Sequence, residues 1–111
     1  MATVYNLAVD QGTDFSTTLD VNDDTGSARN LTGYTGRAQL RRSYHSVSNT
    51  SFTVTINNPS EGEVVISLTN AVTSNLRYGR YVYDVELVKT SDGTVERLLE
   101  GVITVYPEVT K

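Results

Sequence analysis

The chain has 111 residues, contains no cysteine, and carries nine basic against thirteen acidic side chains, so its net charge is −4. This is the length of one domain, residues 1–111, and the lack of cysteine excludes disulfides, thiolate metal sites and a cysteine nucleophile. The acidic balance argues against nucleic acid as a partner, and no apolar run approaches the roughly 18 residues of a membrane span, so we expect no membrane partner.

The first part of the chain contains three segments in which apolar residues recur at a spacing of two, the pattern of strands with one buried face. These segments run from Val4 to Val9, from Phe15 to Val21 and from Tyr34 to Leu40. Between the last two, residues 22–30 are too polar for a core strand and predict an exposed loop at the tip of a hairpin.

The middle of the chain predicts a β-hairpin followed by a helical turn. Residues 52–56 and 64–68 alternate in the same way on either side of turn-forming residues 57–62. The strand period then breaks, and apolar residues within 70–76 have the spacing of one helical turn that bridges two strands.

The last part predicts a second hairpin, residues 81–87 and 95–106, around Ser91-Asp92-Gly93-Thr94. Asp-Gly supplies the positive φ angles that tight turns need, and Pro107 is expected to end the final strand because it cannot donate to a ladder. Tyr81 lies in an L-x-x-G-x-Y-x-Y run that resembles the tyrosine corner of immunoglobulin-like domains, so we expect its hydroxyl to bond to upstream backbone.

The sum of these elements favours an all-β fold. About seven short strands fit an antiparallel immunoglobulin-like β-sandwich, with one short helical turn near residues 70–76. A βαβ fold would need long crossover helices, and a small closed barrel is the alternative.

Residues Asp24-Thr25-Gly26-Ser27 match the catalytic signature of aspartic proteases. That site needs an aspartate at the end of an apolar strand, buried against its twin so that two carboxylates share one proton. Here polar Asn22 and Asp23 precede the motif, and Glu100 interrupts the apolar-apolar-Gly segment that would brace it. A hairpin turn is therefore the better interpretation.

The sequence gives little support for a metal site or for a Ser-His-acid catalytic triad. Asp20, Asn22 and Asp24 have the D-x-N-x-D spacing of a calcium loop, but Thr25 stands where an EF-hand needs glycine and Leu31 where it needs glutamate. His45 is the only histidine, so zinc has no histidine pair, and a Ser-His-acid triad would depend on one residue in a polar loop. We expect a solvated acidic turn and a surface histidine.

Two further groups of side chains could bind ligands. Arg41 and Arg42 with Tyr44 would suit a phosphate or a sugar, but paired arginines at a strand end are more often a solvated edge. Sugar-binding sandwiches present exposed aromatic faces. The seven tyrosines fall mostly on inward positions, and the side is open for four of them, which are Tyr5, Tyr44, Tyr78 and Tyr106.

Three pairs of carboxylates have the spacing that acid–base chemistry would need. None has an apolar flank that would separate the two pKa values, so we expect all to face outward from strands or turns. The pairs are Glu61/Glu63, Asp84/Glu86 and Glu96/Glu100. The sequence thus predicts no catalytic, cofactor-binding or metal-binding residue, no cofactor and no enzyme.

Residues 5–15, 30–42, 79–87 and 100–110 carry a family resemblance, with the motifs Q-G-x-x-F, L-T-G-Y and G-x-Y-x-Y-D. They resemble small tailed-bacteriophage virion proteins and the immunoglobulin-like N-terminal domains of baseplate and tail-fibre-type proteins. The resemblance covers essentially the whole chain. It implies a sandwich module packed into a virion, and it implies no chemistry.

From that resemblance we expect a structural protein of the phage tail, baseplate or neck that docks to neighbouring virion subunits or anchors a fibre. Copies of the chain could also form a homo-oligomer in the particle. A capsid decoration protein and a carbohydrate-binding module for host glycans are the alternatives. Edge strands and the loops at residues 22–30 and 43–51 are the expected contact surfaces.

Overall fold

A computed structural model describes residues 3–23, 25–46 and 49–109. Its strands are β1 (Thr3–Val4), β2 (Leu7–Asp10), β3 (Phe15–Asp20), β4 (Tyr34–Arg41), β5 (Thr50–Ser51), β6 (Thr53–Asn57), β7 (Glu63–Leu68), β8 (Gly79–Lys89) and β9 (Val95–Tyr106). A 3₁₀ turn, η1 (Pro59–Glu61), precedes β7, and a short helix, α1 (Asn70–Thr73), follows it. Sheet A has the order β1-β9-β8-β4-β5, with β2 also paired to β9, and sheet B has the order β3-β7-β6.

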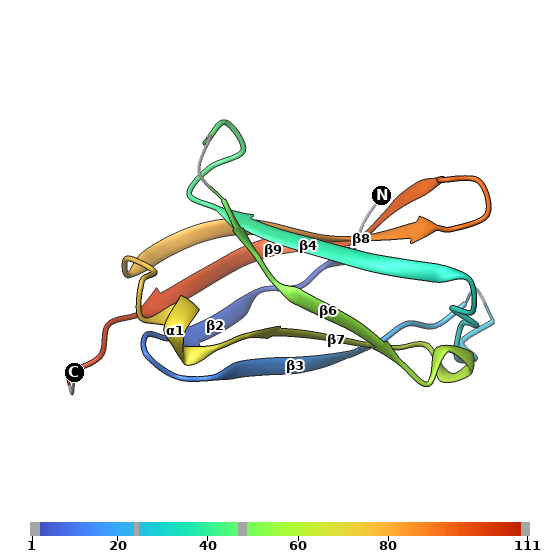
Figure 1. Ribbon diagram of the computed structural model, residues 1–111, viewed down its shortest axis with the longest axis horizontal. Coiled ribbons are helices and arrows are strands. Elements are labelled where there is room, and N and C mark those ends of the chain that lie inside the picture. Colours follow the sequence, from blue (N-terminus) through green and yellow to red (C-terminus); the bar gives the residue numbers. More distant parts are fainter. Residues whose placement is uncertain (1–2, 24, 47–48, 110–111) are drawn as a thin grey trace.

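The two sheets face each other, and the antiparallel immunoglobulin-like sandwich is confirmed (Figure 1). The described residues form nine strands rather than about seven, because one expected strand is interrupted and one further strand was not expected. The interruption separates β1 from β2, and the further strand is β5, which lies in sheet A within the loop predicted at residues 43–51 and is followed by Phe52 and by β6 of sheet B. The last strand ends at Tyr106, before Pro107, as the sequence predicts. The one departure from antiparallel pairing is that β1 and β2 run parallel to β9.

The expected hairpin around residues 22–30 is wrong. Strand β3 lies in sheet B and β4 in sheet A, so this segment crosses between the layers instead of joining two neighbours. Leu31 anchors the crossing, since it is fully buried and its N–H donates to the carbonyl of Pro59 at 2.7 Å. The two predicted hairpins of the second half are confirmed as β6–β7 and β8–β9.

The core lies between the sheets, where the inward side chains of the alternating strands meet. Leu40, Ile66, Leu87 and Ile103 are all at most 1% exposed. Burying a side chain of this kind stabilises the fold by about 1.5–3 kcal/mol relative to leaving it in water. This apolar layer makes the sheets a rigid support for whatever lies on their outer faces and edges.

The predicted helical turn and tyrosine corner are both confirmed. Helix α1 bridges β7 and β8, and the hydroxyl of Tyr81 donates to the carbonyl of Arg77 at 2.6 Å. The guanidinium of Arg42 lies 4.7 Å from the centre of the Tyr81 ring and donates to the carbonyls of Tyr78 and Arg80. In the described part of the chain no helix has the length and apolarity to span a membrane.

A kink at Tyr5–Asn6 fixes the course of the N-terminal segment. The side-chain oxygen of Asn6 accepts a hydrogen bond from the N–H of Val102 at 3.0 Å, and the hydroxyl of Tyr83 donates to the carbonyl of Tyr5. A Cβ at Gly101 would lie 2.4 Å from that same carbonyl oxygen, so only glycine allows the close approach. The whole N-terminal segment therefore joins sheet A, and β3 is left as an edge of sheet B.

Candidate docking surfaces

The outer face of sheet A carries a lattice of charged side chains, which we call the charged face: Arg37, Asp84, Glu86, Arg97 and Glu100. Strand register sets Arg37 and Arg97 on either side of Glu86, and it sets Glu100 opposite Asp84. Arg37 contacts Glu86 at 2.7 Å, and Arg97 lies 3.5 Å from Asp84 and 3.6 Å from Glu100. Opposite charges therefore alternate across three strands in the row Arg37–Glu86–Arg97, whereas the neighbouring row sets the carboxylates of Asp84 and Glu100 side by side.

Asp84 corrects one expectation from the sequence. Burial raises the pKa of its carboxyl group, and the negative charges of Glu86 and Glu100 raise the pKa further, while Arg97 lowers it. The sequence offered no apolar flank for this pair, but a sheet brings neighbours from other strands over the carboxylate and removes water from it. The Asp84/Glu86 pair is thus half-buried, although it does face outward as expected.

The charged face is suited to recognition by ion pairs. A hollow of about 370 Å³ beside it is lined by Arg37, Gln39, Asp84 and Glu86 together with Phe52 of the neighbouring segment. Complementary charges on a partner would fix the register of docking and suppress wrong partners. Ion pairs at such a partly exposed face contribute specificity more than affinity.

The described residues of the loop at 22–30 are exposed apart from the half-buried Arg29, and hydrogen bonds hold several of them in place. The carboxylate of Asp23 accepts hydrogen bonds from the N–H and hydroxyl of Thr25 at 2.9 and 2.6 Å, which lowers the pKa of Asp23. Arg29 forms a two-pronged ion pair with Glu96, both contacts at 2.8 Å, and lies 5.4 Å from the centre of the Tyr34 ring. The loop therefore presents a defined surface.

The protease-like motif falls within this loop. Its first residue, Asp24, lies outside the described residues, and Thr25, Gly26 and Ser27 are all exposed. The N–H of Gly26 donates to the carbonyl of Asp23 at 3.0 Å, as in a turn. The described part of the motif has the solvated environment that the preceding polar residues predict.

The other candidate ligands are also spread over the surface. Asp20, Asn22 and His45 are exposed, and residues 3–23, 25–46 and 49–109 contain no group of three His, Asp or Glu side chains able to hold a metal ion. Arg41 donates to the carbonyl of Ser46 at 2.6 Å, and Arg42 is engaged at the tyrosine corner. Arg41 therefore supports the turn at residues 42–46, whereas Arg42 binds the backbone at Tyr78 and Arg80. Part of the expected contact loop at 43–51, residues 47–48, lies outside the described residues.

The outward orientation expected of the remaining carboxylates is confirmed for Glu61, Glu63 and Glu100. It is wrong for Glu96, which lies opposite the buried Leu87 on the core-facing side of sheet A and pairs there with Arg29. Glu61 is exposed in η1, and Glu63 accepts a hydrogen bond from Asn58 at 3.3 Å. Glu96 and Glu100 are held by different arginines, and Arg29 lowers the pKa of Glu96. In the strand register Glu63 lies opposite Asp20 and Glu100 lies opposite Asp84, so two of these carboxylates have a carboxylate as their cross-strand neighbour.

The expectation that most tyrosines face inward is wrong. Four of the seven are 45–67% exposed, and they are the four whose side the alternation left open: Tyr5, Tyr44, Tyr78 and Tyr106. They come from separate segments. Tyr78 precedes Gly79, whose partner Val105 precedes Tyr106, so these two lie at the same end of the β8–β9 ladder.

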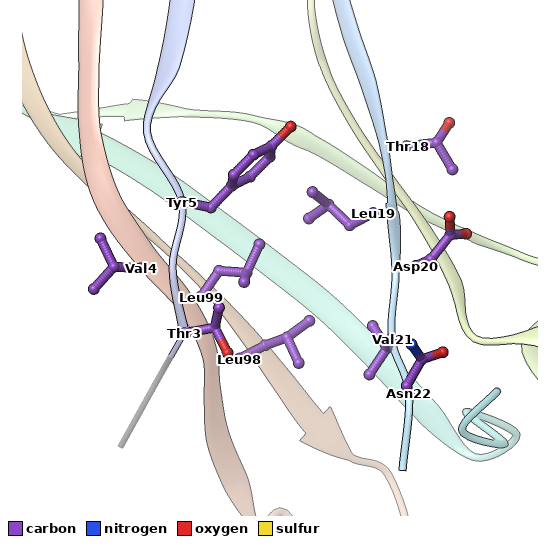
Figure 2. A pocket seen from close by; sticks show the side chains of 10 residues that line it. All are labelled: Thr3, Val4, Tyr5, Thr18, Leu19, Asp20, Val21, Asn22, Leu98 and Leu99. Carbon is purple, nitrogen blue, oxygen red and sulfur yellow. The ribbon is translucent and has the colours of Figure 1, made fainter. Parts of the chain in front are cut away.

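A second surface, which the sequence analysis missed, lies between the edges of the two sheets. It is a hollow of about 360 Å³ between β1 and β3, and we call it the side groove. Figure 2 shows the side chains of Tyr5, Leu19, Leu98 and Leu99 in the space between the two strands. The signal that could have revealed this groove is the high exposure of the apolar residues in the N-terminal strand. That exposure depends on which strand β1 pairs with.

Comparisons with known proteins support the fold. No family model matches the chain, and no curated protein matches it. The chain is similar in structure to the N-terminal domain of phage TP901-1 ORF48, with a TM-score of 0.53 and 13% identity over 96% of this chain and 98% of that one. It is also similar to Listeria monocytogenes InlP, with a TM-score of 0.55 and 18% identity over 92% of this chain.

The lengths of these neighbours differ. This chain spans 26% of the InlP chain but almost all of the phage domain. A third structure, the NK cell receptor Nkp44, matches with a TM-score of 0.49 and 14% identity over 96% of this chain and 99% of that one. At these identities the likeness to the phage domain and to InlP shows a shared fold.

Proposed function

We propose that the chain is a non-enzymatic structural domain of a phage virion, in the tail, baseplate or neck region, that docks to neighbouring subunits or anchors a fibre. The observation that carries the proposal is the structural likeness to the phage TP901-1 ORF48 N-terminal domain, which extends over nearly the whole of both chains. The phage-type motifs of the sequence point the same way.

The chemistry of the surface supports docking. The charged face is broad and alternating in sign, and its half-buried Asp84 and Glu86 lie beside arginines on neighbouring strands. A symmetric particle repeats such a contact many times, so individually weak contacts would still hold the assembly together.

The first experiment locates the protein. Particles are purified, separated into heads and tails, and analysed by mass spectrometry and cross-linking. We expect the chain in tails, with cross-links to tail or baseplate subunits. Recovery only in tailless heads would instead identify a capsid decoration protein, and absence from both fractions would overturn the virion proposal.

The second experiment tests the charged face. We expect Arg97→Glu to reduce incorporation into particles, because it replaces the cation that lies beside Asp84 and Glu100 with a third carboxylate. Arg77→Glu makes the same charge change at an exposed position outside the charged face and is the matched control. Equal incorporation of both variants would show that docking uses another surface.

The exposed tyrosines favour one other function, binding of host surface glycans. Tyr78 and Tyr106 are 61% and 50% exposed at the same end of the β8–β9 ladder, where their rings are available to stack on a sugar. Saturable binding on a glycan array that is lost in Tyr78→Ala or Tyr44→Ala would favour this function over docking.

A further inference from the structure

Strand β3 forms an open edge of sheet B. It pairs with β7 on one side and ends the order of its sheet on the other. Edge strands are usually kept short or blunted by lysine, proline or a bulge, because their free backbone groups pair readily with another strand. The six residues of β3, Phe-Ser-Thr-Thr-Leu-Asp, include neither lysine nor proline, and their pairing with β7 is regular throughout.

The free backbone groups of this edge can be assigned from the ladder. Val21 follows β3 in register and donates its N–H to the carbonyl of Gly62 at 2.8 Å. Backbone direction alternates along an antiparallel strand, so Thr17 and Leu19 also point toward β7. Ser16, Thr18 and Asp20 therefore direct their N–H and carbonyl groups to the open side.

The side groove lies along this open side. Leu19 and Val21 of the β3 segment face Tyr5, Leu98 and Leu99 of sheet A across it (Figure 2). In the same view Thr18 and Asp20 point away from the groove, toward the outer face of sheet B. A strand added to β3 would thus place alternate side chains in the side groove, beside Tyr5, Leu98 and Leu99, and the others on a polar face.

Charge narrows the chemistry of the occupant. Asp20 is the one charged residue among those that border the side groove, and its carboxylate points to the outer face of sheet B. A cation on the outer face of the added strand, opposite Asp20, would form a favourable cross-strand pair, and an anion there would be repelled. The other edge strands are shorter: β1 and β5 have two residues each, β2 has four and β6 has five.

We propose that β3 and the side groove bind an extended segment of a partner polypeptide by strand addition. The segment carries apolar residues at alternate positions and a lysine or arginine on the face between them. This inference rests on the docking function proposed above and names the partner's chemistry: main-chain pairing supplies affinity, and the groove and Asp20 supply specificity.

The test uses two synthetic peptides with blocked ends, Val-Thr-Val-Lys-Val-Thr and Val-Thr-Val-Glu-Val-Thr. Each is titrated into the isotope-labelled chain and followed by amide chemical shifts and hydrogen exchange. We expect the amides of Ser16, Thr18 and Asp20 to shift and gain protection. The lysine peptide should bind about threefold more tightly than the glutamate peptide because of the cross-strand pair with Asp20.

Two substitutions sharpen the result. Thr18→Pro removes an outward N–H at an edge that tolerates proline and should abolish binding. Asp20→Lys should reverse the preference between the peptides, whereas Glu61→Lys, an equal charge change at an exposed residue outside the groove, should leave it unchanged. The Asp20 measurement decides the matter if Thr18→Pro does not fold.

Four results would overturn the inference: no binding at millimolar peptide, shifts that map to another strand, equal binding by a folded Thr18→Pro variant, or pairing of β3 with a second copy of the chain. These measurements use the isolated chain and are independent of the particle experiments. If the chain is found in tails but fails to bind peptide, the proposed β3 site is wrong and the proposed virion function stands. If the chain binds peptide but is absent from particles, the β3 site stands and the virion function is wrong.

Discussion

Replacing Tyr81 with phenylalanine tests the tyrosine corner, the contact that joins α1 to β8. The substitution removes one hydroxyl that donates to the carbonyl of Arg77 at 2.6 Å and keeps the ring that the Arg42 guanidinium covers at 4.7 Å. A neutral hydrogen bond contributes about 1 kcal/mol net, and a carbonyl left without its partner adds to the loss. Because Arg77 is exposed and water can reach its carbonyl, we expect a total loss of about 1–2 kcal/mol.

Urea unfolding followed by far-ultraviolet circular dichroism measures this loss. For a domain of this size about 1 kcal/mol corresponds to a decrease of about 4 °C in Tm, and the denaturant slope should be unchanged. Tyr106→Phe removes a hydroxyl from a ring that is 50% exposed and is the matched control, expected within about 0.5 kcal/mol of the parent. Equal stability of the two variants would refute the reasoning.

Three further predictions concern the charged groups and the N-terminal kink. Arg29 lowers the pKa of Glu96, so the stability that this ion pair adds is present above the ordinary glutamate pKa and is lost as pH falls. We therefore expect Glu96→Gln to lower the free energy of unfolding by less than about 1 kcal/mol at neutral pH and to leave it unchanged in acid. Because burial raises the pKa of Asp84, the parent should lose stability relative to Asp84→Asn as pH rises through that pKa, and the opposite slope in a pH series of unfolding curves would contradict this. Gly101→Ala would place a Cβ 2.4 Å from the carbonyl oxygen of Tyr5. We therefore expect about 1–3 kcal/mol of destabilisation and faster hydrogen exchange at the Tyr5 amide. An alanine variant whose Tyr5 amide exchanges at the parental rate would show that the close approach of Gly101 to Tyr5 does not hold this segment in place.

The sequence predicted most of the strands, both hairpins of the second half, the helical turn and the Tyr81 corner. These features depend on local information. Alternation at a spacing of two states which face of a strand is buried, and Asp-Gly or a proline states where the strand turns or ends. The acceptor of the Tyr81 hydroxyl lies only four residues upstream, so the motif and its contact are contained in one segment.

The partner of each strand was harder to predict. Residues 22–30 have the composition of a hairpin tip, yet β3 and β4 belong to different sheets. The first strand was also expected, but not its parallel pairing with β9. The alternation of apolar and polar residues along a strand is the same whichever strand it pairs with. Pairing is decided by contacts between residues far apart in the chain, and a local pattern does not contain them.

By itself, the sequence determined that this chain is an all-β protein whose strands each bury one face, and it favoured a sandwich over a small closed barrel, which buries one face per strand equally well. Tertiary structure alone decided the surfaces. Neighbouring strands cover Asp84 and raise its pKa, and parallel pairing with β9 on both sides of Tyr5 and Asn6 places the N-terminal segment in sheet A. That choice of sheet exposes the backbone of β3 beside an apolar groove, which no local pattern in the β3 residues records.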